Sequence, residues 1–305
     1  MGRYLLERIA YSGLVVLGVV IVVFAIMRLT GDPTPLLLPI GFTQEDLQRV
    51  RREMELDQPL HAQLRSYMTK VMRGNFGKSL RHHDSAMALV IERMPATLWL
   101  TAAAMAVTVL VALPLGIVAA LRRDSLVDVA ASAVALTGQS MPTFWLGIIF
   151  ILIFGLKLGW LPTSGSGSVR HLVLPSIALG AFSAGLTTRL VRSSLLEVLS
   201  QQYVRTARSK GLAERLVILK HALRNAAIPV VTVVGLQLGT LLGGAIVTET
   251  VFGYPGMARL AVEAVFYRDF PVVQAFVVIT AIIMVTINLV VDLCYVVLDP
   301  RITYA

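Results

Sequence analysis

Uncharged apolar stretches alternate with short charged segments along the chain. Six windows of 19, 28, 28, 17, 24 and 22 residues contain no Asp, Glu, Lys or Arg: Ile9–Met27, Met94–Leu121, Val129–Leu156, Leu172–Thr188, Asn225–Thr248 and Phe270–Val291. A bilayer core of about 30 Å is crossed by about 20 helical residues. Each window therefore predicts a membrane span, and Leu172–Thr188 is expected to borrow a turn from its flank. The pattern predicts an all-α polytopic membrane protein with six transmembrane helices.

Composition supports this fold class. The chain has 305 residues, of which 56% are hydrophobic and 15% charged, and its mean hydropathy is +0.76, whereas soluble domains carry about 25% charged residues. The single cysteine, Cys294, excludes a disulfide framework and a CxxC metal or redox motif. The first window is too long for the apolar core of a typical signal peptide and no A-x-A site follows it, so we expect an uncleaved helix.

The distribution of cations predicts the orientation. With the N-terminus inside, the inner segments carry 13 Lys and Arg and the short outer loops carry 4, while a further 10 lie in the long connection 28–93. Positive residues favour the cytoplasmic side, so both termini and the segment 189–224 are predicted to be cytoplasmic. The net charge of +9 is thereby explained by membrane orientation and does not require a nucleic-acid partner.

The long outer connection predicts a small helical cap. Thr43 and Asp46 have the spacing of a capping box. Apolar residues then recur at helical spacing, at Leu47, Val50 and Met54 and again at Leu64, Met68, Val71 and Met72. The segment has ten basic and eight acidic residues. Such a cap either packs on the helix ends or shapes an outer docking surface, and the residues do not decide between these.

Two patterns in this region are not sites. The stretch Gly74–Ser79 ends like a phosphate-binding P-loop, but Met72 stands where the motif requires its first glycine. The adjacent His82 and His83 have no acidic or cysteine partner at ligand spacing. We therefore expect no nucleotide, cofactor or metal site and no catalytic residue in this chain.

The predicted spans contain few polar or ionisable side chains that could take part in transport chemistry. Prolines lie within or at the edges of the spans and are expected to kink them: Pro95, Pro114, Pro142, Pro175 and Pro229. Asn288 and Asp292 lie four residues apart on the last span and form either a functional pair or a structural one. The spans show no array of acids or histidines for a proton relay, which favours a transporter powered by other subunits over an ion-coupled one.

A basic segment interrupts the apolar blocks between Glu197 and Pro229. From Arg189 to Arg224 there are eight Lys and Arg and two acids, and Gly211 divides two segments that each predict a short helix. The stretch Tyr203–Leu212, with Lys220–Asn225 and Pro229, resembles the EAA loop of binding-protein-dependent ABC importer permeases.

The whole chain resembles the first permease subunit of the dipeptide, oligopeptide and nickel importers. Supporting stretches are Leu56–Leu60, Ser140–Trp145, Gly159–Pro162, Glu249–Gly256 and Leu298–Ile302. Arg205 and Thr206 stand where the general motif has Glu and Ala, a departure usual for the peptide branch, while Ala207 and Gly211 keep their places.

The resemblance implies a type I importer permease fold with defined parts: a tail and first helix (1–28), the extracytoplasmic cap (29–93), a five-helix core (94–298) and a cytoplasmic tail (299–305). In the family a loop, here 197–225, couples the permease to the ATPase. The resemblance assigns this coupling to Arg205, Thr206, Ala207, Arg208, Lys210, Gly211, Leu212, His221 and Arg224. It implies a homologous second permease, two ATP-binding cassette subunits that use ATP and Mg, an extracytoplasmic binding protein and a bacterial cytoplasmic membrane.

The expected function is ATP-driven import of di- or oligopeptides or a related cargo such as haem, a nickel chelate or glutathione. The alternative from another class is a self-sufficient ion-coupled transporter or channel, which an uncoupler would stop. A membrane enzyme is a weaker alternative, because no metal cluster or nucleophile–base spacing supports it.

Overall fold

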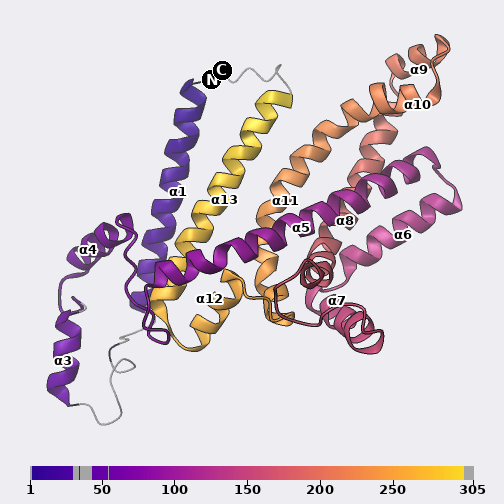
Figure 1. Cartoon of the computed structure of the whole chain (residues 1–305). Coiled ribbons are helices and arrows are strands. Elements are labelled where there is room, and N and C mark those ends of the chain that lie inside the picture. Colours follow the sequence, from indigo (N-terminus) through magenta and orange to yellow (C-terminus); the bar gives the residue numbers. More distant parts are fainter. Residues whose placement is uncertain (1, 30–33, 35–42, 54, 299–305) are drawn as a thin grey trace. The chain divides into compact units, whose positions relative to one another are not determined.

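The computed structural model describes residues 2–29, 34, 43–53 and 55–298, and these residues are mainly helical (Figure 1). The expected tail 299–305 lies outside them. The long helices are α1 (Gly2–Leu29), α5 (Ala86–Leu121), α8 (Arg170–Leu199), α11 (Leu223–Val251) and α13 (Phe270–Leu298). The shorter ones are α3 (Gln44–Glu53), α4 (Leu60–Met72), α6 (Leu126–Ser140), α7 (Thr143–Phe150), α9 (Gln202–Ser209), α10 (Glu214–Leu216) and α12 (Met257–Phe266), with π-helical segments η1 (Ile151–Lys157) and η2 (Val217–Ala222).

Among the described residues, five helices are long and apolar enough to cross a membrane, and a bent pair counts as a sixth span if its halves are taken together. In that pair α6 meets α7–η1 at 104°. The sequence placed an uncharged window across this break and expected a kink at Pro142. Met141 is extended (φ −85°, ψ 131°), as residues before proline tend to be, and Pro142 has no N–H to continue the helix.

The described residues form two compact units, one of which comprises residues 95–259 and 287–298. Its central helix is α8. The marginal window Leu172–Thr188 was expected to borrow one turn from its flank, and α8 extends it further, from Arg170 to Leu199. An added Cβ at Gly180 would lie 2.7 Å from the Ala104 carbonyl oxygen, and one at Gly185 would lie 2.2 Å from that of Ala135. These glycines therefore let neighbouring helices approach α8 closely.

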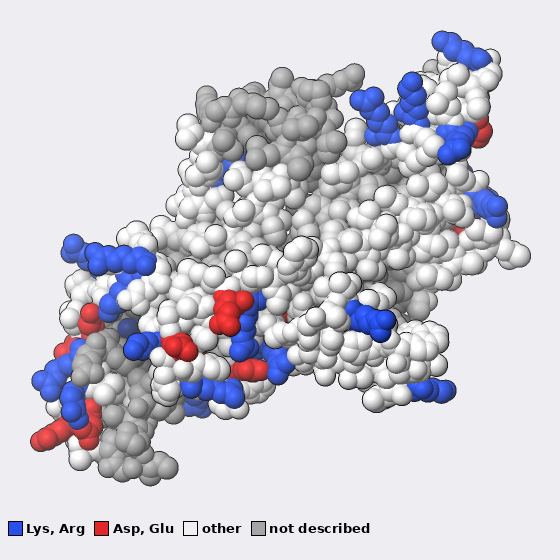
Figure 2. All heavy atoms as spheres, viewed as in Figure 1, with Lys and Arg blue, Asp and Glu red and all other residues white. Residues whose placement is uncertain are grey.

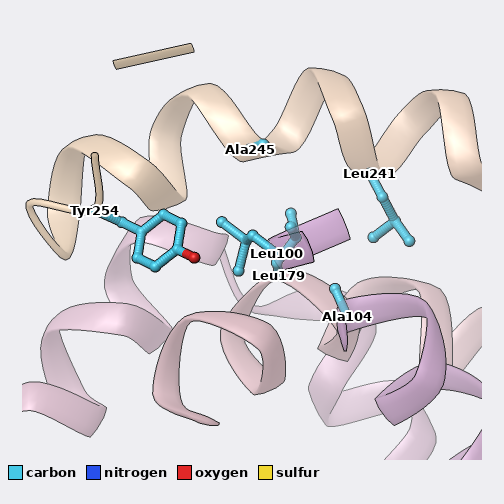
Figure 3. Packing of buried hydrophobic residues seen from close by; sticks show 6 residues of the cluster. All are labelled: Leu100, Ala104, Leu179, Leu241, Ala245 and Tyr254. Atoms are coloured by element: carbon cyan, nitrogen blue, oxygen red, sulfur yellow. The ribbon is translucent and has the colours of Figure 1, made fainter. Parts of the chain in front are cut away.

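An apolar cluster joins α8 to α5 and α11. It consists of Leu100, Ala104, Leu179, Leu241, Ala245 and Tyr254, all nearly inaccessible to solvent. Figure 3 shows Leu241 and Ala245 on one helix above Leu100 and Leu179, with the Tyr254 ring beside them. The cluster packs these three helices against one another.

The other unit comprises residues 1–94 and 260–286. The capping box predicted at α3 is present: the Thr43 N–H donates to Asp46 Oδ2 (3.1 Å), and the Asp46 N–H donates to Thr43 Oγ1 (3.2 Å). α4 packs on the end of α1, where the rings of Phe24 and Tyr67 are 5.6 Å apart. The Ser79 hydroxyl donates to the buried Asp269, so the stretch that resembles a P-loop ends in a structural contact.

Candidate functional site

The basic segment connects two membrane helices through a compact turn. α8 ends at Leu199, α9 spans Gln202–Ser209, and the chain then turns at Gly211, whose φ of +74° favours glycine. The second arm begins at Glu214 and continues through η2 into α11 as one span, Glu214–Val251. The expectation of two separate short helices is therefore correct for the first arm only. The second arm is not a separate short helix, because η2 continues directly into α11.

The inner face of α9 is anchored by apolar contacts. Val204 and Ala207 are buried against Val217 of η2. Val198, Leu199 and Leu212 pack around this cluster. Since Val204 and Ala207 lie three residues apart, they share one face of the helix, and the remaining positions face outward. The cluster holds α9 on the end of the span.

The outer face of this turn is basic. Arg205, Thr206, Arg208 and Lys210 are all exposed, and so is Arg215 beyond the turn. Figure 2 shows Lys and Arg side chains gathered at the α9–α10 segment, whereas mostly uncharged surface covers the spans. The loop thus presents cations on a framework anchored by apolar residues.

An ion pair closes the turn around Gly211. Arg208 Nε donates to Glu214 Oε2 (3.1 Å), and Nη2 donates to Oε1 (2.6 Å). The Glu214 carboxylate raises the pKa of the Arg208 guanidinium. Because both side chains are about half exposed, the pair contributes geometry more than stability. The sequence prediction included Arg208 but missed Glu214, although an acid shortly after a glycine turn is a detectable signal.

A second bridge ties α9 to the start of the following span. Asn225 Nδ2 donates to the Tyr203 hydroxyl (2.7 Å) and to the His221 carbonyl (3.2 Å). His221 is thereby placed at the junction, half-buried, while Arg224 is exposed. Of the predicted residues, Ala207 and Leu212 share one apolar cluster. The two arms are also joined by Tyr203 and Asn225, which the prediction did not include.

The predicted polar pair on the last helix lies elsewhere. Asn288 is exposed and Asp292 is half-buried, one turn apart on α13. Their arrangement assigns no chemistry to either residue.

A buried carboxylate that the sequence prediction missed holds the start of α12. Glu249, at 0% exposure, accepts a hydrogen bond from the Thr97 hydroxyl (2.5 Å) and one from the Arg259 N–H (2.9 Å). Thr97 Oγ1 in turn accepts from the Met257 N–H (2.9 Å). Together they satisfy N–H groups that a helix N-terminus leaves open. A side chain at Gly256 would collide with the Glu249 carboxylate.

A second polar link joins α6 to α8. Arg192 donates to both carboxylate oxygens of Asp128, each at 2.7 Å. Asp128 is buried and also accepts from the Asp124 N–H (3.0 Å). Paired, bidentate geometry of this kind is how a charge is accommodated away from water. Among the described residues, no group of three or more His, Cys, Asp or Glu could hold a metal ion.

Comparison with known proteins decides the family. The profile of the family described as "Binding-protein-dependent transport system inner membrane component" matches residues 112–304, and the N-terminal profile of such transport membrane components matches residues 1–101. The chain belongs to this family. Proteins of this family are membrane components of transporters, which places the chain in an inner membrane as a transport subunit of an ABC importer.

Curated family members resemble the chain over its whole length. The glutathione transport system permease protein GsiC of Salmonella choleraesuis (strain SC-B67) is 44% identical over 305 residues, which is 100% of both chains. GsiC of Escherichia coli (strain K12) is 41% identical over 306 residues, again covering 100% of both.

Solved structures with this fold are ABC importers. An inward-facing structure of the MetNI methionine ABC transporter aligns with a TM-score of 0.59 at 19% identity, covering 70% of this chain and 97% of the other. A crystal structure of an amino acid ABC transporter with histidines gives 0.54 at 19% identity, with 68% and 93% covered. This chain therefore has the type I ABC importer permease fold.

Proposed function

We propose that this chain is one half of the translocation path of an ATP-driven importer of glutathione, and that its loop 197–225 docks on a cytoplasmic ATPase. The cargo proposal is supported by relatives named as glutathione permeases, which align with the whole chain at 41–44% identity. Glutathione is a short peptide, as the resemblance to the peptide branch requires. Other di- or oligopeptides, haem and nickel chelates are the competing cargoes.

The coupling proposal rests on one observation. The basic outer face of α9 is exposed while its apolar inner face is fixed to the end of the Glu214–Val251 span. A partner that grips α9 would therefore move that span directly. Exposed charges at such a contact set orientation and association rate more than affinity. In this proposal a homologous second permease completes the path, a binding protein delivers cargo, and both termini are cytoplasmic.

In the same proposal the chain itself binds no cofactor. ATP and Mg act in the two ATPase subunits, and their cycle shifts the permease between two packed states. The chain provides the path and the mechanical connection.

Uptake of labelled glutathione into vesicles containing the reconstituted complex tests the proposal. Uptake is expected to require ATP, to stop when the catalytic acid of the ATPase is removed, and to persist with an uncoupler. Uptake driven by a proton gradient without ATPase would establish the ion-coupled alternative instead. ATP-dependent uptake of another dipeptide in preference to glutathione would refute the cargo and retain the transport mechanism.

A further inference from the structure

A cavity of about 430 Å³, lined by apolar side chains together with several charged and polar ones, lies within the unit that contains α1, in the size range of small-molecule sites. Its walls come from the last turns of α1, from α4 and from the start of α13. The described residues that line it include three cations, Arg28, Lys70 and Lys78, and one acid, Glu55. Lys70 Nζ already contacts Glu55 Oε1 at 3.1 Å. The lining therefore has an excess of positive charge that suits an anion.

Two polar atoms in this lining have unused hydrogen-bonding capacity. The Tyr67 hydroxyl and Gln63 Oε1 are buried and have no hydrogen-bond partner among the described residues. Gln63 as a whole is only 6% exposed. Burial raises the pKa of Tyr67 to about 12, so the hydroxyl remains a donor at neutral pH. Buried polar groups are normally hydrogen-bonded, and a ligand with polar oxygens would provide the missing partners.

A second cavity, of about 380 Å³, is lined mainly by apolar side chains. None of the described residues that line it is charged. It is formed mainly by α1, from Gly13 to Val20, by α4 and by α13, with Phe76 beside them. Along α1 only 11% of the membrane-spanning window is buried by the described residues, so this cavity adjoins a helix that the rest of the chain leaves largely uncovered. Its lining suits a hydrocarbon chain.

The two cavities are neighbours, because Phe76 lines both of them and α1, α4 and α13 each contribute residues to both. On α1 the polar lining lies at Phe24–Arg28 and the apolar lining at Gly13–Val20, and α13 has the same order from its N-terminus. At 1.5 Å per residue, Gly13 to Arg28 spans about 22 Å, close to half of the roughly 40–45 Å bilayer with its head groups. Together the two cavities extend over about the thickness of one leaflet, with charged residues at one end and apolar residues at the other, as a phospholipid requires.

We propose that these neighbouring cavities bind one anionic phospholipid, with its phosphate head group among Arg28, Lys70 and Lys78 and one acyl chain in the apolar cavity. A phosphate oxygen accepts from the lysines and from Tyr67, while a glycerol hydroxyl donates to Gln63. A soluble cargo would leave the apolar cavity unfilled. Placement in the outer leaflet rests on the proposed orientation, whereas binding itself does not.

Native mass spectrometry of the detergent-solubilised full chain, titrated with defined lipids, tests the head-group half. Phosphatidylglycerol is expected to bind about tenfold more tightly than phosphatidylcholine. Lys78→Gln should weaken phosphatidylglycerol binding about fivefold, the usual effect of one cation near an anionic lipid. The matched control is Arg73→Gln, because Arg73 is an exposed cation of the same cap that does not line the cavity. Equal binding of the two lipids, or equal loss in both variants, overturns the proposal.

Two glycines of α1 test the acyl-chain half. An added Cβ at either Gly13 or Gly18 meets nothing within 4 Å, but only Gly13 lines the apolar cavity. Gly13→Phe should fill the cavity and lower phosphatidylglycerol binding about tenfold, while Gly18→Phe should bind as wild type. Equal behaviour of the two variants contradicts an acyl-chain site.

A water-soluble probe separates a lipid from a free anion. Glycerol 1-phosphate carries the head-group charge without acyl chains and is expected to bind at least a hundredfold more weakly than phosphatidylglycerol. Comparable binding would identify a small-anion site and refute the lipid. A wild-type complex that takes up no glutathione, although the chain binds phosphatidylglycerol, would contradict only the proposed transport function.

Discussion

The Thr97 hydroxyl donates to the Glu249 carboxylate at 2.5 Å across 152 residues of sequence. Thr97 Oγ1 simultaneously accepts from the Met257 N–H. Thr97 is thus both donor and acceptor in a buried network that fixes the start of α12 to α5 and α11. Thr97 is fully buried, with 0% of its surface exposed to solvent.

Replacing Thr97 should destabilise the protein. Thr97→Val keeps the shape but leaves the Met257 N–H and one Glu249 oxygen without this partner, which costs about 2–4 kcal/mol for two buried polar groups. The measurement is the midpoint of thermal unfolding in detergent. Thr137→Val is the matched control, because Thr137 is exposed and donates to the Ala133 carbonyl of its own turn. Equal midpoints for both variants would contradict the network.

Loss of the Asp128 charge should lower the stability of the protein, because Arg192 donates to both carboxylate oxygens of Asp128. Asp128→Asn removes the charge that Arg192 contacts and should lower the free energy of unfolding by about 2 kcal/mol, the scale of hydrogen bonds to charged groups. Asp124→Asn is the control, since the Asp124 carboxylate is 77% exposed and contacts Arg123 at 3.1 Å. Denaturant unfolding of the two variants checks this. An effect confined to Asp124→Asn would refute a stabilising role for the pair.

Charge reversal on α9 should uncouple hydrolysis from transport. Arg205→Glu changes an exposed side chain, so insertion and folding are expected to persist while ATP-driven uptake falls about tenfold or more. Uptake and ATP hydrolysis are measured together in vesicles. Arg122→Glu, at an exposed cation of the α5–α6 turn, controls for net charge. Normal uptake with Arg205→Glu would remove Arg205 from the docking surface.

A paired substitution separates docking from the shape of the turn. Arg208→Glu alone breaks the contact with Glu214 and should lower uptake. Adding Glu214→Arg restores an ion pair of opposite direction. If the pair serves to close the turn, the double variant should recover most of the uptake. Failure to recover would mean that the positive charge of Arg208 is itself required.

The start of α3 should be acid-sensitive. Hydrogen bonds from Thr43 lower the pKa of Asp46 from 3.8. A lowered pKa in the folded state means that the cap contributes stability above about pH 4 and loses it as the pH falls through the folded value. Hydrogen exchange in residues 44–53 should therefore quicken at acid pH relative to α4 after correction for intrinsic rates. Asp46→Asn should abolish this dependence, and an unchanged pH profile in that variant would exclude Asp46 as the cause.

The sequence predicted the helices well because long uncharged windows leave few alternatives. α8 shows the limit of using charge to end a predicted helix. Arg189 and Arg192 were assigned to a loop, yet both lie in α8. There the charge of Arg192 is paired with Asp128. The capping box at Thr43 was predictable because its contacts are local. The angle of 104° at Met141–Pro142 was not, because proline marks a break without setting its size.

The same reasoning explains what was missed at the sites. Glu249 ended a predicted span simply because it is charged, while its partners Thr97 and Arg259 are distant or undistinguished in sequence. On the basic loop, motif spacing located Gly211 and α9. The anchoring by Val217 and Asn225 required the three-dimensional arrangement, because both lie on the opposite arm. Signals within a few residues of sequence could be recognised, whereas contacts between residues far apart in the sequence could not.

The continuity of the Glu214–Val251 span makes it a lever. One end carries the turn with α9, and the other carries Glu249, which holds α12. At 1.5 Å per residue the span is about 55 Å long when followed along its axis, although η2 and Pro229 interrupt its regularity. A tilt of about 10° around its middle, taken by the whole span as one body, would move each end by up to about 5 Å, in opposite directions.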